Sequence, residues 1–207
     1  MLILASHSPR RREILAQAGI PFLVQPADLR EEQVSGEDAA SHVRRLARLK
    51  AEAVRGGPGD LVLGADTVVA VDDEILGKPV NAAQATEMLR RLSGREHRVV
   101  TGICLIAPSG TVVDAQTTQV RFVPLSEQEI AGYVASGEPM DKAGAYAIQG
   151  LASKFIDRVE GCYFNVVGLP VALVYKHWKA LTAAAGTTVG AAESGPSPGE
   201  TILTPGS

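Results

Sequence analysis

The chain has 207 residues, of which 45% are hydrophobic, and a formal net charge of −3 at pH 7. This size and apolar content predict one α/β domain, and the slightly acidic balance argues against a nucleic-acid-binding surface. The two cysteines show no CxxC spacing, which argues against a disulfide or a zinc site. No apolar run reaches the length of a membrane span, and residues 1–5 are too short for a signal-peptide core, so we expect a cytoplasmic protein without membrane contact.

Residues 2–5 form an apolar strand pattern, and a turn rich in hydroxyls and arginines follows it. Ser8 and Pro9 are typical of the first positions of a helix. The arginines at 10–12 would then lie at the positive end of the helix dipole, where cations are unfavourable unless an anion joins them. The pattern favours a phosphate site at this turn over the alternative that the arginines are solvated surface residues.

A second short strand is predicted over residues 21–24, followed by a polar loop that contains Glu31. Carboxylates in such loops are usually solvated, although one could contact a metal ion. Ser35 and Asp38 are typical of a helix start, and the apolar spacing predicts a helix over about 37–55. Lys50 lies on this helix, where spacing alone would place it on the surface.

The most informative stretch is the continuous apolar run over residues 61–71, which predicts a strand buried on both faces. One carboxylate, Asp66, lies in its middle. A buried carboxylate is costly unless it is paired, so Asp66 either bonds Thr67 or a backbone amide, or it faces a metal or a cation. Gly64 favours the second interpretation, because a glycine in a strand often marks a close approach by a ligand.

Two polar residues further along the chain each have two interpretations. Gln149 lies in an irregular stretch over 138–150, and its amide could read the edge of a base or could satisfy loop backbone groups. His97 precedes a strand and could be a base, although a single histidine there is more often structural.

A turn over 77–79 presents Lys78 close to the strand that contains Asp66.

The remaining pattern alternates helices and strands up to about Leu181. Asn81 and Ser126 are predicted to cap two helices, which end near residues 93 and 136. We expect strands over 98–107, 112–123, 155–159 and 163–167, a last helix from Gly168 to about Leu181, and a disordered tail over 182–207.

Six segments, taken together and in order, resemble the Maf family of nucleoside-triphosphate pyrophosphatases. These segments are LASHSPRR (4–11), GADT (64–67), LGKP (76–79), SGREH (93–97), DKAGAYAIQG (141–150) and NVVGLP (165–170). The resemblance covers residues 2 to about 180 and implies a domain over 1–181. It also implies an α/β fold with a mixed twisted sheet flanked by helices, and two lobes around a cleft, similar to the inosine-triphosphate pyrophosphatases (Maf/Ham1-like).

The resemblance implies that the protein hydrolyses a nucleoside triphosphate, with dTTP and UTP favoured, to the monophosphate and pyrophosphate, using Mg²⁺ or Mn²⁺. Two alternatives stay open: the same reaction on 7-methyl-GTP or another modified nucleotide, and a nucleotide-binding regulator of septum formation. A homodimer is also consistent with the resemblance. Carried over to this sequence, the family roles are catalysis for Asp66, Lys50 and Lys78, substrate binding for Ser8, Arg10, Arg11, Thr67 and Gln149, and metal binding for Glu31 and Asp66.

Overall fold

A computed structural model describes residues 1–189, except residues 30–31, 33, 55–56 and 73. Seven strands join in one sheet in the order β2-β1-β3-β5-β6-β7, and β4 pairs with β3. The strands are β1 (Leu2–Leu4), β2 (Phe22–Val24), β3 (Leu61–Val71), β4 (Glu74–Leu76), β5 (Glu96–Ala107), β6 (Gly110–Phe122) and β7 (Ile156–Glu160). The pairs β1–β2 and β1–β3 are parallel and the remaining pairs are antiparallel, which confirms the predicted mixed sheet.

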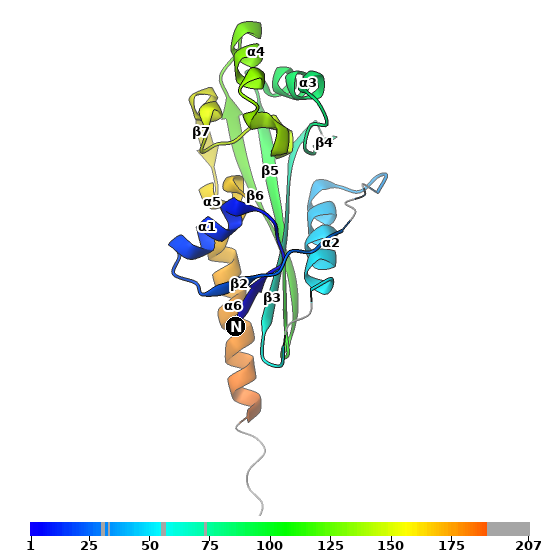
Figure 1. Ribbon diagram of the computed structural model, residues 1–207, viewed down its shortest axis with the longest axis vertical. Helices are drawn as coiled ribbons and strands as arrows, with labels where there is room; N and C mark the ends of the chain where they lie inside the picture. Colours follow the sequence, from blue (N-terminus) through cyan, green and yellow to red (C-terminus); the bar gives the residue numbers. More distant parts are fainter. Residues whose placement is uncertain (30–31, 33, 55–56, 73, 190–207) are drawn as a thin grey trace, which may run out of the picture.

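Helices cover this sheet in two groups, one at each end of the long strands (Figure 1). In the described part of the chain the α-helices are α1 (Pro9–Gln17), α2 (Ala39–Glu52), α3 (Ala82–Leu92), α4 (Glu127–Ala135), α5 (Tyr163–Val167) and α6 (Val171–Val189), and the short 3₁₀ helices are η1 (Glu138–Asp141), η2 (Ala143–Ala145) and η3 (Leu151–Phe155). Within the described residues, every helix falls short of the length and apolarity that a membrane span needs.

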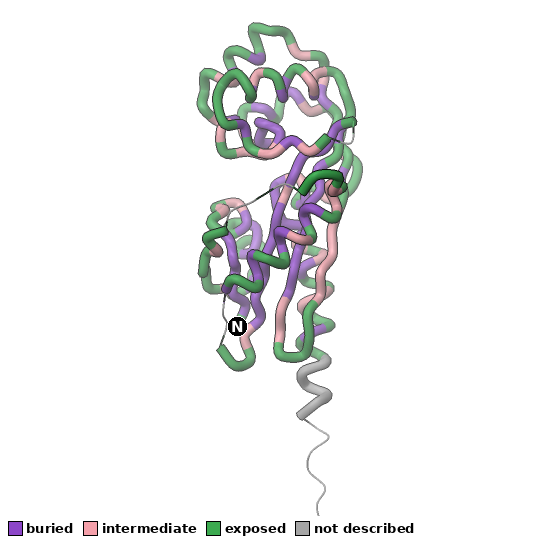
Figure 2. Tube along the Cα trace, turned by 90° about the vertical axis from the view of Figure 1, so that its right-hand side faces the viewer, coloured by how far each residue is buried: buried purple, intermediate pink, exposed green. Residues whose placement is uncertain are grey.

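Two hydrophobic cores lie on one face of the same long strands, one toward each end, because every second side chain of a strand points to the same face of the sheet. Leu61, Leu63 and Ala65 of β3 pack with α1 and α6 in one core, whereas Val69 and Val71 pack with α3 and α4 in the other. Buried residues follow the strands through both ends of the molecule (Figure 2). The predicted two lobes are therefore two cores that share one sheet.

The opposite face of the sheet is covered by α2, which approaches unusually closely. A Cβ atom at Gly64 would lie 2.1 Å from the carbonyl oxygen of Ala47, and one at Gly102 would lie 2.3 Å from that of Val43. Both glycines are needed because the backbone of the helix occupies the space of their side chains. The prediction that Gly64 admits a ligand is therefore wrong: the close neighbour of Gly64 is α2.

Most predicted elements are confirmed, and the exceptions lie near the ends of the chain and in short segments. Asn81 and Ser126 cap α3 and α4 through hydrogen bonds from backbone amides, as predicted. The strand predicted over 163–167 is wrong, because this segment is the helix α5, whose Asn165 side chain donates to the sheet at the Val99 carbonyl and at Thr118. The short strand β4 was not predicted, and α6 continues past Leu181 to Val189.

Candidate active site

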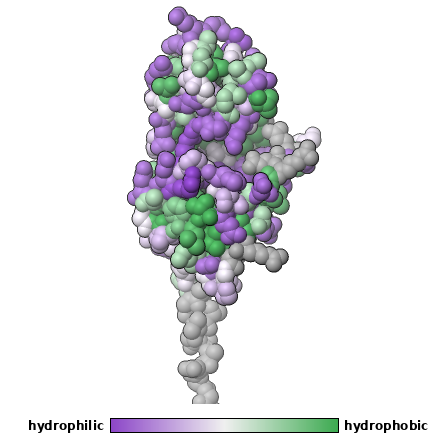
Figure 3. Space-filling view, viewed as in Figure 1, coloured by the Kyte–Doolittle hydropathy of each residue, from purple (hydrophilic) through white to green (hydrophobic). Residues whose placement is uncertain are grey.

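A cleft of about 540 Å³ opens where the edge of β3 is uncovered. β1 pairs with β3 only as far as Leu63, and β4 begins its pairing at Val69, so no strand formed by the described residues pairs with residues 64–68 on that side. The gap lies between the two lobes, where hydrophilic side chains form a band across the face shown in Figure 3. The cleft walls come from residues 5–11, α2, the β3 edge, residues 77–78, residues 141–146 and residues 166–168.

Asp66 lies on this open edge and forms an ion pair with Lys50 of α2. The Lys50 Nζ to Asp66 Oδ1 distance is 2.7 Å, and the two side chains are 10% and 8% exposed. The close approach of α2 at Gly64 brings the lysine there, because Gly64 and Asp66 lie on the same face of β3. Lys50 is therefore buried in the cleft wall, and the expectation from spacing that it lies on the surface is wrong.

Arg11 holds the open edge together by hydrogen bonds to backbone and hydroxyl groups. Its guanidinium donates to the carbonyls of Ala65 and Gly168, at 2.9 Å each, and to the hydroxyls of Ser6 and Thr67, at 3.0 and 3.1 Å. The bond to Ala65 satisfies an edge carbonyl that a neighbouring strand would otherwise take. Thr67 also contacts the Thr101 hydroxyl at 2.9 Å. Arg11 and Thr67 line the cleft but bind protein groups, so their geometry suits positioning of the wall.

The start of α1 offers hydrogen-bond donors to the cleft. Ser8 is the N-cap, Pro9 occupies the first helical position as predicted, and the Ser8 side chain makes no capping hydrogen bond. Arg10 lines the same cleft and has no hydrogen bond or ion pair to the described residues. A helix N-terminus with a free hydroxyl and an unpaired cation is a favourable environment for an anion.

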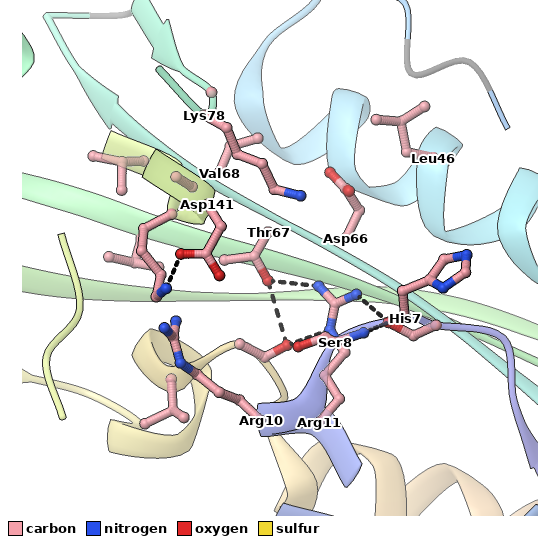
Figure 4. Close-up of a pocket in the computed structure, with 18 of the residues that line it drawn as sticks. His7, Ser8, Arg10, Arg11, Leu46, Asp66, Thr67, Val68, Lys78 and Asp141 are labelled. Carbon is pink, nitrogen blue, oxygen red and sulfur yellow. Dashed lines mark hydrogen bonds and ion pairs between the residues drawn. The ribbon is translucent and has the colours of Figure 1, made fainter. Parts of the chain in front are cut away.

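Further cations reach the cleft from the other lobe. Lys78 is exposed, lines the cleft and has no partner among the described residues. Figure 4 shows that its amine and the Asp66 carboxylate point into the same space. Lys142 also lines the cleft and pairs with Asp141. The backbone amide of Gly144 donates to the Gly77 carbonyl at 3.0 Å, which ties the segment with Lys142 to the segment with Lys78.

Three residues singled out in the sequence are not placed in the cleft. Gln149 is exposed in a turn and is absent from the described residues that line the cleft, and Glu31 falls outside the described part of the chain. His97 is buried at 3% exposure, and one ring nitrogen, Nε2, lies 2.8 Å from the Tyr146 hydroxyl. Burial lowers the pKa of His97 to about 4, so the ring is neutral at pH 7 and structural.

Sequence reasoning missed two cleft residues, His42 and Lys142. The signal for His42 was available, because His42, Leu46 and Lys50 follow each other at the four-residue spacing of one helix face. The spacing predicts only that these residues share one helix face. It does not predict that this face borders a cleft. Lys142 sits in an irregular segment with no period from which to place it.

The fold and the cleft define a mixed α/β protein with a buried carboxylate in a cation-lined cleft, which suits a polyanionic ligand. The family model described as Maf-like protein matches residues 1–181. The chain belongs to the Maf family.

Two curated relatives and one solved structure illustrate the similarity. The dTTP/UTP pyrophosphatase of Koribacter versatilis (strain Ellin345) is 51% identical over 176 residues, which cover 84% of this chain and 91% of that protein. The dTTP/UTP pyrophosphatase of Symbiobacterium thermophilum is 54% identical over 171 residues, which cover 82% and 88%. The structure of the Staphylococcus aureus Ham1 protein superposes with a TM-score of 0.42 and 18% identity, over 58% of this chain and 71% of that chain.

Proposed function

We propose that this chain hydrolyses nucleoside triphosphates, dTTP and UTP foremost, to the monophosphate and pyrophosphate. The observation that carries the proposal is the buried Asp66–Lys50 pair at an open strand edge, faced by Lys78 across the cleft. The relatives named dTTP/UTP pyrophosphatase, which share about half of their residues with this chain, support the choice of substrate.

In this proposal Asp66 accepts the proton of the attacking water. Lys50 binds one carboxylate oxygen, Oδ1, and so fixes the orientation of the group, while the other oxygen has no hydrogen-bonding partner among the described residues. A positioned carboxylate of this kind contributes roughly 10²–10⁴-fold to the rate as a general base. Lys50 acts through Asp66 and is a positioning residue.

The cations of the cleft neutralise the triphosphate. Arg10 and Lys78 are the described cleft cations without a protein partner, so their charges are available to phosphate oxygens. Ser8 and the backbone amides at the start of α1 add donors for the same oxygens. Charge developing on the departing pyrophosphate is stabilised by these groups, because donors fixed before the reaction need no reorganisation.

The donor chemistry of the cleft fits a divalent cation that is shared with the substrate. No cluster of three or more His, Cys, Asp or Glu residues able to hold a metal occurs in the described part of the chain. Mg²⁺ is commonly bound by one or two carboxylates together with substrate phosphates, and the unpaired oxygen of Asp66 meets that need. Asp66 would hold the ion, with Glu31 as the second predicted ligand. When bound, the ion supplies positive charge to the phosphate oxygens.

The test is pyrophosphate release from a panel of canonical and modified nucleoside triphosphates, measured with Mg²⁺, with Mn²⁺ and with a chelator. The proposal expects metal-dependent release from dTTP and UTP. Release from 7-methyl-GTP alone would retain the reaction and overturn the pyrimidine assignment. If folded protein released pyrophosphate from none of the substrates, the enzymatic proposal would be wrong and a nucleotide-binding regulator would remain.

A further inference from the structure

His42 is a cleft residue to which the proposed reaction gives no role. It lies in the first turn of α2, two turns before Lys50 on the same helix face, and both side chains border the cleft. Its side chain is only 5% exposed. A buried histidine that reaches a ligand cleft from a rigid helix can act on the ligand, provided one ring nitrogen remains available.

The contacts of His42 decide which nitrogen is available. Nδ1 lies 3.2 Å from Oε2 of Glu37. Hydrogen bonds from Arg45 hold the pKa of the Glu37 carboxyl below its usual value, so at neutral pH this carboxylate only accepts hydrogen bonds. We assign the hydrogen to Nδ1, because the Glu37 acceptor at 3.2 Å is nearer to it than the Arg45 donor at 3.4 Å. Nε2 is left without a partner among the described residues, and the ring borders the cleft.

The charges around His42 oppose one another. The Glu37 carboxylate favours a charged ring. Two features disfavour it: the guanidinium of Arg45, whose Nη2 lies 3.4 Å from Nδ1, and the positive end of the α2 dipole. Asp38 is occupied at the helix start by the amides of Ala40 and Ser41.

The cleft that the ring borders adds its own charges. Asp66 pairs with Lys50 and Asp141 with Lys142, and the cleft is also lined by His7, Arg10, Arg11 and Lys78. A bound polyanion would therefore be the strongest new influence on the ring, and it favours the charged form. Phosphate oxygens accept hydrogen bonds, so only a ring that has a hydrogen on Nε2 can bind them.

We propose that His42 is a phosphate-binding residue of the cleft, which takes up one proton from solvent at Nε2 when a polyphosphate binds and donates that hydrogen to a phosphate oxygen. Nδ1 keeps its hydrogen and donates it to the Glu37 carboxylate throughout. The ring therefore becomes an imidazolium between two anions. The inference rests on the proposed function only in taking a polyphosphate as the ligand.

The experiment is calorimetric titration of the full chain with inorganic pyrophosphate, in several buffers of different ionisation enthalpy at one pH near 7. The dependence of the observed heat on the buffer gives the number of protons taken up on binding. Wild type is compared with His42→Gln, which keeps a neutral hydrogen-bonding group. Protonation of pyrophosphate itself is common to both proteins and cancels in the difference.

The matched controls are two of the three other histidines. His7→Gln changes the second histidine that lines the cleft, and His177→Gln changes one that pairs with Asp114 elsewhere. We expect His42→Gln alone to remove the proton uptake and to weaken pyrophosphate binding by about tenfold, as for one charge-assisted hydrogen bond. Unchanged uptake in His42→Gln, or loss of uptake only in His7→Gln, would overturn the proposal, as would wild type that does not bind pyrophosphate.

A second measurement covers the case in which His42→Gln does not fold. The titration of the imidazole resonances of wild type, followed by NMR with and without pyrophosphate, should show one cleft histidine whose pKa rises on binding and whose second nitrogen stays bonded to a carboxylate. A pKa that does not move contradicts the inference. Because these readouts report binding, they remain interpretable if the protein proves unable to hydrolyse triphosphates.

Discussion

Replacing Gly64 by alanine should separate the two halves of the buried ion pair. The added Cβ would lie 2.1 Å from the Ala47 carbonyl oxygen, whereas such contacts are essentially never shorter than 3.0 Å, so α2 must retreat by about 0.9 Å. A retreat of that size along the bond would lengthen the 2.7 Å contact between Lys50 and Asp66 to about 3.6 Å, beyond hydrogen-bonding range.

The expected costs follow from these distances. Overpacking of this kind costs about 1–3 kcal/mol, which corresponds to a fall in Tm of roughly 2–12 °C for a chain of this length. A displacement near 1 Å in a group that positions the reacting atoms costs about 10²-fold in rate. We therefore expect Gly64→Ala to lower kcat for dTTP by about 10²-fold, measured by pyrophosphate release at a temperature where the variant remains folded.

The control is Gly132→Ala on α4, where an added Cβ meets no atom within 4 Å. Removing a helical glycine should raise Tm slightly and leave kcat unchanged. Gly102→Ala tests the same reasoning at a second site, because its Cβ would lie 2.3 Å from the Val43 carbonyl oxygen. Wild-type kcat and Tm in Gly64→Ala would show that α2 does not set the position of Lys50.

Three further outcomes are expected. Lys78→Met should raise KM for dTTP at least tenfold with an unchanged Tm, because this exposed cation has no partner among the described residues. Arg11→Met should lower Tm, because it leaves two backbone carbonyls without their donor. Equal effects of the two substitutions on Tm would refute this distinction. His97 has a pKa of about 4 in the fold against 6.5 for the free side chain, so the unfolded chain binds the extra proton and stability falls as pH drops from 6.5 to 4, by up to about 3 kcal/mol. Denaturant unfolding across that pH range should show a larger loss in wild type than in His97→Gln, because carboxyls with a lowered pKa, such as that of Glu37, add a loss common to both proteins. Burial raises the pKa of Cys104 to about 11, so a thiol reagent at pH 8 should label Cys162 in the native protein and reach Cys104 only after unfolding; rapid labelling of both would contradict this burial.

The strands and helix starts could be predicted because their signals are local. The apolar run around Asp66 is a buried strand over the predicted residues 61–71, and Asn81 and Ser126 cap the helices that follow them. The turn at Ser8 could likewise be recognised as a donor-rich helix start. In each case the physical cause lies within a few neighbouring residues.

The partner of Asp66 could not be predicted, because it depends on two elements far apart in the chain. Lys50 reaches Asp66 only because Gly64 and Gly102 let α2 lie against the sheet. The cleft itself arises where β1 ends at Leu4 and leaves the strand edge open, which is a property of sheet pairing. The prediction of a strand over 163–167 was wrong because the β-branched and aromatic residues of this segment fit either structure. The helix is favoured by the hydrogen bonds that the Asn165 side chain donates to the sheet.

The roles of Gln149 and Glu31 remain predictions from the family resemblance. Gln149 is exposed in a turn whose neighbours are held in place: Glu138 accepts from the Leu151 amide at 3.1 Å and from the Tyr133 hydroxyl at 2.8 Å. This anchoring holds the turn against the lobe that contains α4. A sequence contains no signal for such a contact, because the carboxylate lies 13 residues from the amide it binds.

If Asp66 takes a proton from water during hydrolysis, as we propose, then Asp66→Asn should abolish the reaction without abolishing binding. The measurement is pyrophosphate release from dTTP by wild type and variant, together with the affinity of each for a nonhydrolysable dTTP analogue and the Tm of each protein. We expect release to fall by at least about 10²-fold in the variant while the affinity changes little. A folded Asp66→Asn protein that releases pyrophosphate at the wild-type rate would contradict the proposal.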